Sequence, residues 1–320
     1  RLCAAVTTEF ENVPAASLNL LAAHMPVSPA GSAVSIAQDR AAEKAHFVRC
    51  GVPCAPYAVI EAEAQLAAVS PSLLPGILKT ARMGYDGKGQ VRVKTTEELA
   101  TAWRQLGGVA CVLEKMLPLA HECSVIVARG RDASIVNLPV QRNLHREGIL
   151  AVTEVYEGNL PAAQVEQALA AAKSVADGLD YVGVLCVEFF VLQDGMLVVN
   201  EIAPRPHNSG HYSQNACDVS QFELQVRCMT GLPLTQPRQH SPSIMLNLLG
   251  ELWFAHGGEQ PAAPAWDQVL ALPGCHLHLY GKRDAKRGRK MGHLNVTGAT
   301  VEQVRATALR AAAILGIAAF

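Results

Sequence analysis

The sequence has almost no net charge, few aromatic residues and no long apolar run. Its 27 Lys and Arg against 28 Asp and Glu give a formal charge of −1, and 5% of the residues are aromatic. Such a chain lacks both the basic footprint and the aromatic platform of a nucleic-acid binder, and the footprint of an anionic-membrane binder. Nothing approaches the ~18 consecutive apolar residues of a membrane-spanning helix. With 320 residues, half of them apolar, the chain is long enough for two or three domains with a sizeable core.

The nine cysteines lack the paired spacing of a zinc site. Cys50 and Cys54 are the closest pair, and without a second half their spacing is a weak zinc signal. We therefore expect reduced, buried thiols in a cytoplasmic protein without a signal peptide. The chain begins at Arg1, and residues 4–7 read as a strand already in progress, so we expect further sequence upstream.

Helices and strands are both indicated without strict alternation, which is typical of a mixed α/β or α+β fold. The spacing of apolar residues predicts helices over residues 15–23, 39–50, 61–69, 97–106, 161–179, 221–230 and 301–315. Strands are predicted over 77–79, 90–93, 110–114, 124–127, 134–140, 182–192 and 196–203, with further strands after 274.

Asp194 and Gly195 give the strongest hairpin signal in the chain. With these two as the turn residues, Glu188 lies directly opposite Glu201, at a Cβ separation of about 4.5–5.5 Å. Both carboxylates lie in apolar strands. The apolar residues predicted on the same face are Val184, Cys186 and Phe190 beside Glu188, and Leu197 and Val199 beside Glu201.

Two opposed carboxylates on a half-buried face are destabilising unless something neutralises them. A divalent cation with oxygen ligands would do so, and Asn200 offers a third oxygen. Magnesium usually takes one or two carboxylates together with substrate phosphates. Two alternatives stay open: one glutamate faces solvent, or Arg205 pairs with it. A one-residue slip in register would also separate the pair.

A glycine-rich loop lies between two predicted strands, with Lys79 just upstream; it reads Gly84-Tyr85-Asp86-Gly87-Lys88-Gly89-Gln90. Glycines let backbone amides approach a phosphate, and lysines add charge. The loop is neither a P-loop nor a dinucleotide fingerprint, because both open a helix. An ordinary glycine-rich hairpin is the alternative. Together with the acidic pair, the loop indicates an ATP site. Glu114 would begin the segment that lines adenine and Glu122 would accept the ribose hydroxyls, unless these two are ordinary surface carboxylates.

Residues 203–215, directly after the second glutamate, are dense in hydrogen-bonding side chains, and we expect them to contact substrate. His207 and His211 have a spacing of four, but prolines and a glycine oppose the regular helix that a zinc pair would use. Residues 282–293 form the one dense basic run. They are either a solvated loop or a phosphate-binding loop, since arginine suits bidentate phosphate contacts.

On these residues the sequence resembles the ATP-grasp ligases, and within them the family of 5-(carboxyamino)imidazole ribonucleotide synthetases. The similar stretches run in family order over nearly the whole chain, and the His-Asn-Ser-Gly-His run at 207–211 is the most specific. The stretches are residues 8–14, 38–40, 84–90, 143–150, 200–204, 207–211, 220–223 and 288–295.

The resemblance implies an ATP site, a magnesium pair, and a pocket for the ribonucleotide and bicarbonate. ATP would contact Arg40, Lys79, the loop from Gly84 to Gln90, Glu114, Lys115, Met116, Leu117, Glu122, His145, Asn200 and Glu201. Glu188 and Glu201 would hold magnesium. The substrate would be bound by Asn208, Ser209, His211, Arg289 and Lys290. The residues implied in catalysis are Lys79, Tyr85, Asp86, His145, Arg205 and His211.

The resemblance also implies the architecture and the reaction. Residues 1–39 would be the remnant of a Rossmann-like pre-ATP-grasp unit, 40–230 an ATP-grasp domain with a lid over about 74–125, and 231–320 a small α+β domain. The implied reaction is the ATP- and bicarbonate-dependent carboxylation of the amine of aminoimidazole ribonucleotide, in a cytoplasmic homodimer. The alternatives are another ATP-grasp ligase, of the formate-dependent transformylase or carboxylase type, and a non-catalytic ATP-binding subunit.

Overall fold

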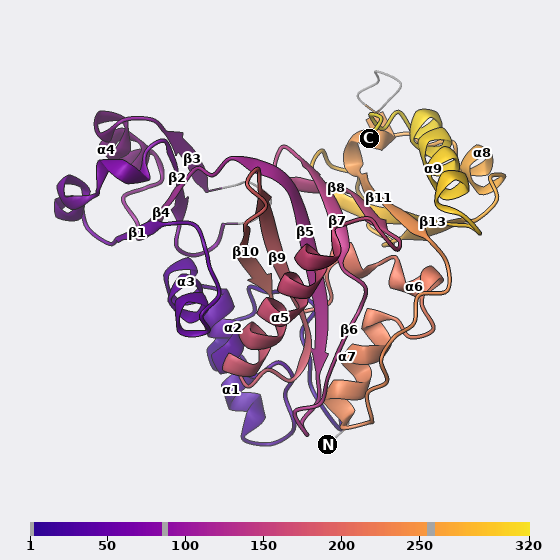
Figure 1. The fold of residues 1–320 in the computed structure, drawn as a ribbon, viewed down its shortest axis with the longest axis horizontal. Helices are drawn as coiled ribbons and strands as arrows, with labels where there is room; N and C mark the ends of the chain where they lie inside the picture. Colours follow the sequence, from indigo (N-terminus) through magenta and orange to yellow (C-terminus); the bar gives the residue numbers. More distant parts are fainter. Residues whose placement is uncertain (1–2, 85–88, 255–259) are drawn as a thin grey trace.

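Two β-sheets, one of four strands and one of nine, organise the part of the chain that the structure describes (Figure 1). The computed structural model describes residues 3–84, 89–254 and 260–320. The smaller sheet has the order β1-β4-β2-β3. Its strands are β1 (Tyr57–Ile60), β2 (Gly76–Thr80), β3 (Gln90–Val93) and β4 (Cys111–Lys115). This sheet and α4 (Thr96–Gln105) form one lobe, which we call the lid unit.

The larger sheet runs β10-β9-β5-β7-β8-β11-β13-β12, and β6 pairs with β5. Neighbouring strands along it are antiparallel. The strands are β5 (Leu119–Arg129), β6 (Ile135–Asn137), β7 (Gln141–Arg146), β8 (Ile149–Val155), β9 (Gly183–Leu192), β10 (Leu197–Ala203), β11 (Ser243–Leu249), β12 (Cys275–Leu279) and β13 (Lys290–Thr297).

Helices cover both faces of the central strands β5 and β9. On one face the core is closed by α2 (Gly31–Ala37), α3 (Arg40–Arg49) and α5 (Ala162–Gly178). On the other face it is closed by α6 (Ser213–Ala216) and α7 (Gln221–Thr230). Burial on both faces explains why β9 reads as a nearly continuous apolar run.

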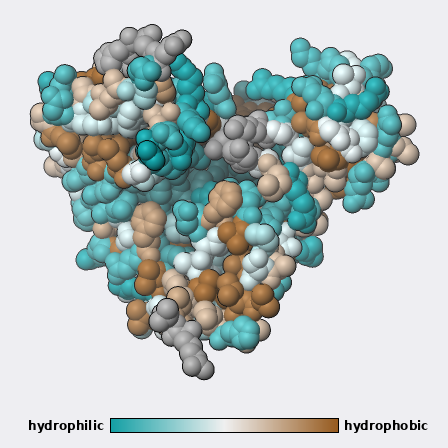
Figure 2. Space-filling model, turned by 180° about the vertical axis from the view of Figure 1, so that it is seen from behind, coloured by the Kyte–Doolittle hydropathy of each residue, from teal (hydrophilic) through white to brown (hydrophobic). Residues whose placement is uncertain are grey.

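The remaining helices lie at the two ends of the chain. α1 (Ala15–Ala22) precedes α2, and α8 (Trp266–Leu270) and α9 (Val301–Leu315) pack on β11, β12 and β13 in a second lobe, the C-terminal unit. Figure 2 shows the surface hollowed between the two upper lobes, with hydrophilic residues beside the hollow. Among the described residues, no helix is both long and apolar enough to cross a bilayer.

The start and end of α3 have identifiable local causes. The Asp39 side chain accepts hydrogen bonds from the N–H groups of Ala41 (3.0 Å) and Ala42 (3.1 Å), which caps the first turn. Gly51 follows the helix with φ of +68°, a conformation that glycine adopts without strain. These signals set the residues at which α3 begins and ends.

The structure confirms the mixed fold class, and most of the predicted elements lie where the sequence places them. The strands β7, β8 and β11 and the helices α2, α6 and α8 were not predicted, and the helix expected over 61–69 is a 3-10 helix over Glu63–Ala68. The prediction of buried thiols is only partly right. All nine cysteines are free, but Cys3 is exposed, and Cys50, Cys54 and Cys275 are half-buried.

A core substitution tests the packing of the central strands. Leu185 is fully buried in β9, so Leu185→Ala should lower the free energy of unfolding by about 2–5 kcal/mol through lost contacts and the cavity left behind. Val226 on α7 is 51% exposed, and Val226→Ala should change it by less than about 0.5 kcal/mol. Urea unfolding followed by circular dichroism measures both; equal losses would contradict this core.

Candidate active site

The β9–β10 hairpin places Glu188 directly opposite Glu201, as predicted. The strand register that we predicted between the turn and this pair is wrong, however. Near the turn, Leu197 pairs with Val191 and Val199 with Phe189, and the register then shifts by one residue between Val199 and Glu201. The extra residue is Asn200, so β10 contains a β-bulge at this position.

The bulge also corrects the predicted faces of β10. Leu197 and Val199 lie in the apolar core beneath α5, together with Ile202. They therefore do not share a face with Glu201, as the simple alternation predicted. Successive side chains of a strand normally point to opposite faces of the sheet. One extra residue reverses the faces of all the residues beyond the bulge. The carboxylate of Glu201 thus joins the face of Glu188 while its neighbour Ile202 stays in the core.

Glu188 is held between two histidines. His207 Nε2 donates to Glu188 Oε1 (3.0 Å), and His145 Nε2 lies 3.7 Å from Glu188 Oε2. Burial raises the pKa of Glu188, but the contact with His207 and the charges of His145 and Lys290 outweigh it and bring the pKa to about 2. Glu188 is therefore a carboxylate at neutral pH although its side chain is only 12% exposed.

His145 connects two carboxylates. Its Nδ1 is hydrogen-bonded to Glu122 Oε2, and its Nε2 faces Glu188. Burial lowers the pKa of His145, but its hydrogen bond to the Glu122 carboxylate and the charge of Glu188 raise it above its ordinary value. The predicted ATP contacts at 122 and 145 therefore lie together with the acidic pair on one surface of the sheet.

Glu201 pairs with Arg40 rather than with Arg205. The distance from Arg40 Nη1 to Glu201 Oε2 is 3.3 Å. The Arg205 guanidinium contacts Glu11, and its Nη1 donates to Pro206 O (3.0 Å). The alternative in which Arg205 neutralises one of the pair is therefore wrong.

A second cluster of charges joins the lid unit to α3. The Nζ atoms of Lys79 on β2 and Lys44 on α3 lie 3.1 Å and 3.4 Å from Glu114 Oε2 on β4. Burial raises the pKa of Glu114, but the two lysines outweigh it and hold the pKa below its ordinary value. Burial lowers the pKa of Lys79 in spite of Glu114. The Glu114 side chain thus serves an ion-pair cluster and is not a surface carboxylate.

The oxygen atoms around the acidic pair fit a hard cation. Asn200 Oδ1, on the residue next to Glu201, is buried, and within the described ranges it has no hydrogen-bond partner. Unpartnered buried oxygens are costly unless a ligand satisfies them. Two carboxylates and such oxygens are the donor set that magnesium prefers. A softer triad, Cys186, Glu188 and His207, also brings its ligand atoms within 4.8 Å of one another; His211 is not part of it.

The base of the glycine-rich loop lies close to α3. Thr80 N–H donates to Gly89 O (2.9 Å), Gly89 has φ of +72°, and Arg40 N–H donates to Ala81 O (2.9 Å). Gly84 is half-buried and Gln90 begins β3. Four loop residues with predicted roles, Tyr85, Asp86, Gly87 and Lys88, lie outside the described residues.

The end of β4 and the residues that follow it, 115–117, adjoin the segments before β1 and β2. Lys115 N–H donates to Pro56 O and Met116 N–H to Pro75 O, both at 2.9 Å. These two amides are therefore committed to holding the strand end, and Leu117 follows them before β5 begins.

The polar run after β10 divides into two roles. Ser209 is fully buried, and its hydroxyl lies 2.8 Å from Ser124 Oγ and 3.0 Å from His207 Nδ1. It therefore holds the Nδ1 side of the His207 ring, while the Nε2 side faces Glu188. Asn208 Nδ2 is buried and, within the described ranges, has no hydrogen-bond partner.

His211 belongs to a stack of aromatic rings at the C-terminal unit. Its ring lies 4.4 Å from that of His293, which lies 4.5 Å from that of His278. Gln221 holds His211 Nδ1 at 2.9 Å, and Tyr280 Oη lies 3.0 Å from His293 Nδ1. Burial lowers the pKa of His211, and burial and His278 lower that of His293 to about 3. These imidazoles are therefore neutral at pH 7.

The basic run brings cations to the edge of this site. Arg289 is half-buried, its Nη1 donates to Asp284 O (2.8 Å), and its own carbonyl accepts from Gly250 N–H (2.9 Å). Lys290 begins β13, and its charge acts on both Glu188 and His211. The basic run thus comes close to both the acidic pair and the polar run after β10.

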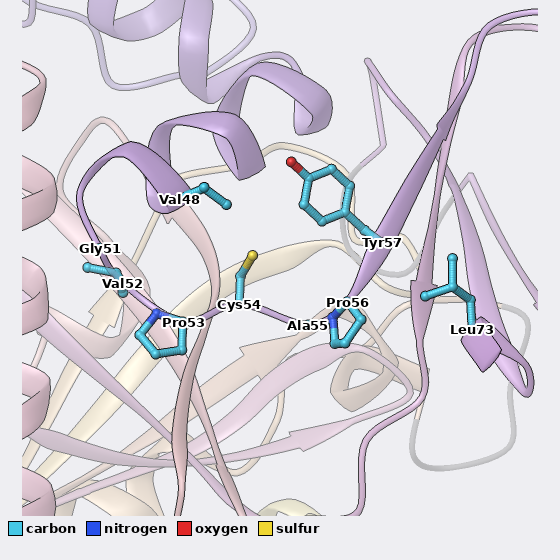
Figure 3. Close-up of a pocket in the computed structure, with 9 residues that line it drawn as sticks. All are labelled: Val48, Gly51, Val52, Pro53, Cys54, Ala55, Pro56, Tyr57 and Leu73. Atoms are coloured by element: carbon cyan, nitrogen blue, oxygen red, sulfur yellow. The ribbon is translucent and has the colours of Figure 1, made fainter. Parts of the chain in front are cut away.

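A separate groove of about 500 Å3 runs along the segment that joins α3 to β1 (Figure 3). The Cys54 thiol points into it between Val48 and Tyr57. The other lining residues are Gly51, Val52, Pro53, Ala55, Pro56 and Leu73. This lining is apolar and carries no charged side chain, so it does not suit a nucleotide.

Sequence reasoning missed several site residues. Three residues with contacts in or beside the site were not singled out from the sequence: Glu43, Lys44 and His293. The spacing of Arg40, Glu43 and Lys44 on a predicted helix places them on one face, which was an available signal. The role of His293 required the pairing of β13 with β12, which no local pattern gives.

Comparisons with known proteins agree with this geometry. The family model of the ATP-grasp domain matches residues 45–222, that of the ribonucleotide synthetase preATP-grasp domain matches 1–38, and that of the phosphoribosylaminoimidazole carboxylase C-terminal domain matches 243–307. The chain is 40% identical over 292 residues to the N5-carboxyaminoimidazole ribonucleotide synthase of Brucella melitensis, covering 90% of this chain and 78% of that protein.

Solved structures give the same result. A carboxyaminoimidazole ribonucleotide synthase of Aspergillus clavatus complexed with ATP is 30% identical, with a TM-score of 0.88. The Aspergillus clavatus enzyme in complex with ADP and 5-aminoimidazole ribonucleotide is 29% identical, with a TM-score of 0.88. In both comparisons the similarity covers 98% of this chain and 82% of the other.

Because the ATP-grasp family model matches residues 45–222, more than half of the chain, the chain is an ATP-grasp protein, and this is its fold. At the level of the particular enzyme, the chain belongs to the N5-carboxyaminoimidazole ribonucleotide synthase family.

The neutral histidines predict a pH dependence of stability. The folded pKa of His293, about 3, lies below its ordinary value, so protonation favours the unfolded chain. The free energy of unfolding should fall by about 1.4 kcal/mol per pH unit from this group as the pH drops below about 6.5. Urea unfolding at pH 7.5 to 5 measures the slope. His293→Phe should flatten it by about one proton, whereas Val226→Ala, which removes no titratable group, should not. An unchanged slope in His293→Phe would contradict a neutral stack.

Proposed function

We propose that this chain catalyses the ATP- and bicarbonate-dependent carboxylation of 5-aminoimidazole ribonucleotide, with ADP and phosphate as the other products. The chain is an ATP-dependent ligase of purine biosynthesis by its family. The observation that carries the proposal is that Glu188 and Glu201 share one face of the sheet with His207 and the charge of Lys290. A phosphate-handling site and a polar substrate loop thus adjoin each other.

In the proposed first step, a bicarbonate oxygen attacks the γ-phosphorus of ATP and ADP leaves. In the second, the amine nitrogen of the ribonucleotide attacks the carboxyphosphate carbon and phosphate leaves. Such chemistry needs positioning and neutralisation of charge rather than a protein nucleophile. Lys79 and the backbone amides of the loop 84–90 would face the transferring phosphoryl group, and Arg40 would approach from α3.

Magnesium would be held by Glu188 and Glu201, with Asn200 Oδ1 as a further oxygen. When bound, it supplies neutralisation of the charge on the phosphate oxygens. His207 and His145 each occupy one side of Glu188, which fixes its carboxylate in one orientation. Glu122 keeps one oxygen on His145, and its other oxygen would accept the ribose hydroxyls.

The second substrate would lie between the polar loop and the C-terminal unit. His211, Asn208, Arg289 and Lys290 would contact the ribonucleotide and bicarbonate, and Arg205, held by Glu11, would supply a cation to the same space. Ser209 would act through His207. Tyr85 and Asp86, in the glycine-rich loop, would help to exclude water, which would otherwise hydrolyse carboxyphosphate.

The domain boundaries at residues 39, 230 and about 74–125, the homodimer and the cytoplasmic location stay predictions of the resemblance.

Substrate dependence tests the reaction. With magnesium, ATP and fixed bicarbonate, ADP release should depend strongly on aminoimidazole ribonucleotide, because carboxyphosphate is made productively only when its acceptor is bound. ADP release without that dependence would favour a different ATP-grasp ligase. No release under any condition would favour a non-catalytic ATP-binding protein.

A matched pair of carboxylates tests the metal assignment. Glu201→Gln keeps the size of the side chain but removes its charge, so kcat should fall by at least about 100-fold, the scale of losing an electrostatic contact of a few kcal/mol. Glu154 on β8, four strands away from β10 in the sheet, pairs with Arg305 on α9, and Glu154→Gln should keep kcat. Steady-state ADP release measures both. Full activity in Glu201→Gln would exclude Glu201 as a metal ligand.

A further inference from the structure

The position of Glu201 depends on the bulge in β10. Next to the turn, the β9–β10 register pairs Val199 with Phe189. If that register continued, Asn200 would lie opposite Glu188, and Glu201 would point into the apolar core beneath α5. The extra residue therefore decides whether the two carboxylates share a face.

One turn of α3 contacts the bulged segment at three successive residues. Lys44 Nζ donates to Asn200 O (2.9 Å), and Ile202 N–H donates to Glu43 Oε1 (2.8 Å). Arg40 contacts the Glu201 carboxylate between them. Residues at i, i+3 and i+4 lie on one face of a helix, which explains how a single turn reaches three adjacent residues.

β10 is an edge strand of the nine-stranded sheet, so backbone groups on its outer side need partners from elsewhere. Val199 N–H donates to Pro53 O (2.8 Å), and α3 supplies the next partners along the strand. Side-chain partners can follow an irregular backbone that a regular neighbouring strand could not pair. The α3 contacts are thus suited to a bulge.

Glu43 and Lys44 occupy costly positions for these contacts. They are 2% and 0% exposed, respectively. Burying an ionisable group is unfavourable unless it is paired and hydrogen-bonded. Burial raises the pKa of Glu43 to about 8 although Lys44 and Arg40 lower it. The contact to Ile202 needs an acceptor oxygen, which an amide also offers.

We propose that Glu43 and Lys44 are positioning residues that hold the β-bulge at Asn200 and so keep Glu201 on the face of Glu188. Neither residue touches the substrates in this role. The proposal rests on the magnesium pair of the proposed function. It adds that the geometry of the pair is set from α3, outside the hairpin.

The test uses the whole chain with ADP bound, and Mn²⁺ as the probe of cation binding, so that no turnover is needed. Glu43→Leu keeps the volume but removes the acceptor, and the Mn²⁺ dissociation constant should rise about 10–100-fold, as for other residues that orient metal ligands. Glu43→Gln keeps an acceptor and should bind Mn²⁺ nearly as the unchanged chain does. Hydrogen exchange of the Ile202 amide should accelerate in Glu43→Leu and not in Glu43→Gln.

His46 on the same helix supplies the matched control. It is buried, but its Nε2 contacts Val175 O (3.1 Å) on α5 rather than β10. His46→Gln should lower the midpoint of thermal unfolding and leave Mn²⁺ binding unchanged. A loss of Mn²⁺ binding in His46→Gln equal to that in Glu43→Leu would overturn the proposal, because general loosening of α3 would then explain both.

The remaining outcomes separate this inference from the proposed function. Unchanged Mn²⁺ binding in a folded Glu43→Leu overturns the positioning role. If Glu43→Leu does not fold, Lys44→Met, which keeps the aliphatic stem, is measured in the same way; failure of both to fold assigns them to the fold as a whole and also overturns it. Glu201→Gln is the reference. If it too binds Mn²⁺ normally, the magnesium pair itself is wrong. If it loses binding while Glu43→Leu does not, only the positioning role fails.

Discussion

The requirement that two carboxylates stand together on one face of an apolar hairpin governs much of this structure. Like charges at cross-strand positions repel, and the strands that carry them are otherwise suited to a core. Around the pair, the chain supplies cationic or hydrogen-bonding side chains from four directions: Arg40 from α3, His145 from β7, His207 from the loop after β10, and Lys290 from β13. The sheet order brings these distant residues to one surface.

The charge cluster of Lys44, Lys79 and Glu114 solves a related problem. The lid unit has its own sheet, and Glu114 and Lys79 both lie on it, whereas Lys44 belongs to α3. A buried carboxylate with two lysines is expensive to separate, because each partner left alone would be an uncompensated charge. The cluster therefore ties the lid unit to α3, which itself packs on the nine-stranded sheet.

The sequence was sufficient for the fold class, for most helices, and for the face-to-face glutamates, because these follow from local periodicity and one turn signal. It was insufficient where tertiary contacts overrule alternation. The Asn200 bulge compensates for a turn one residue longer than predicted, so the correct pair was reached through an incorrect register. Glu114 looked like the start of an adenine-lining segment, and only the fold shows Lys44 beside it. The strand β7, which carries His145, and its neighbour β8 lack clear alternation of apolar and polar residues and were missed.

The contact between Arg205 and Glu11 joins the N-terminal segment to the loop after β10. The two residues are 194 positions apart, and the arginine follows the acidic hairpin directly. Gln38 reinforces the same region by donating to the carbonyls of Glu11 and Val13, both at 2.6 Å. Covalent connection gives these groups a high effective concentration for one another. Two separate polypeptides would have to form this contact by diffusion. Within one chain, the first forty residues are always available to hold the loop that follows β10.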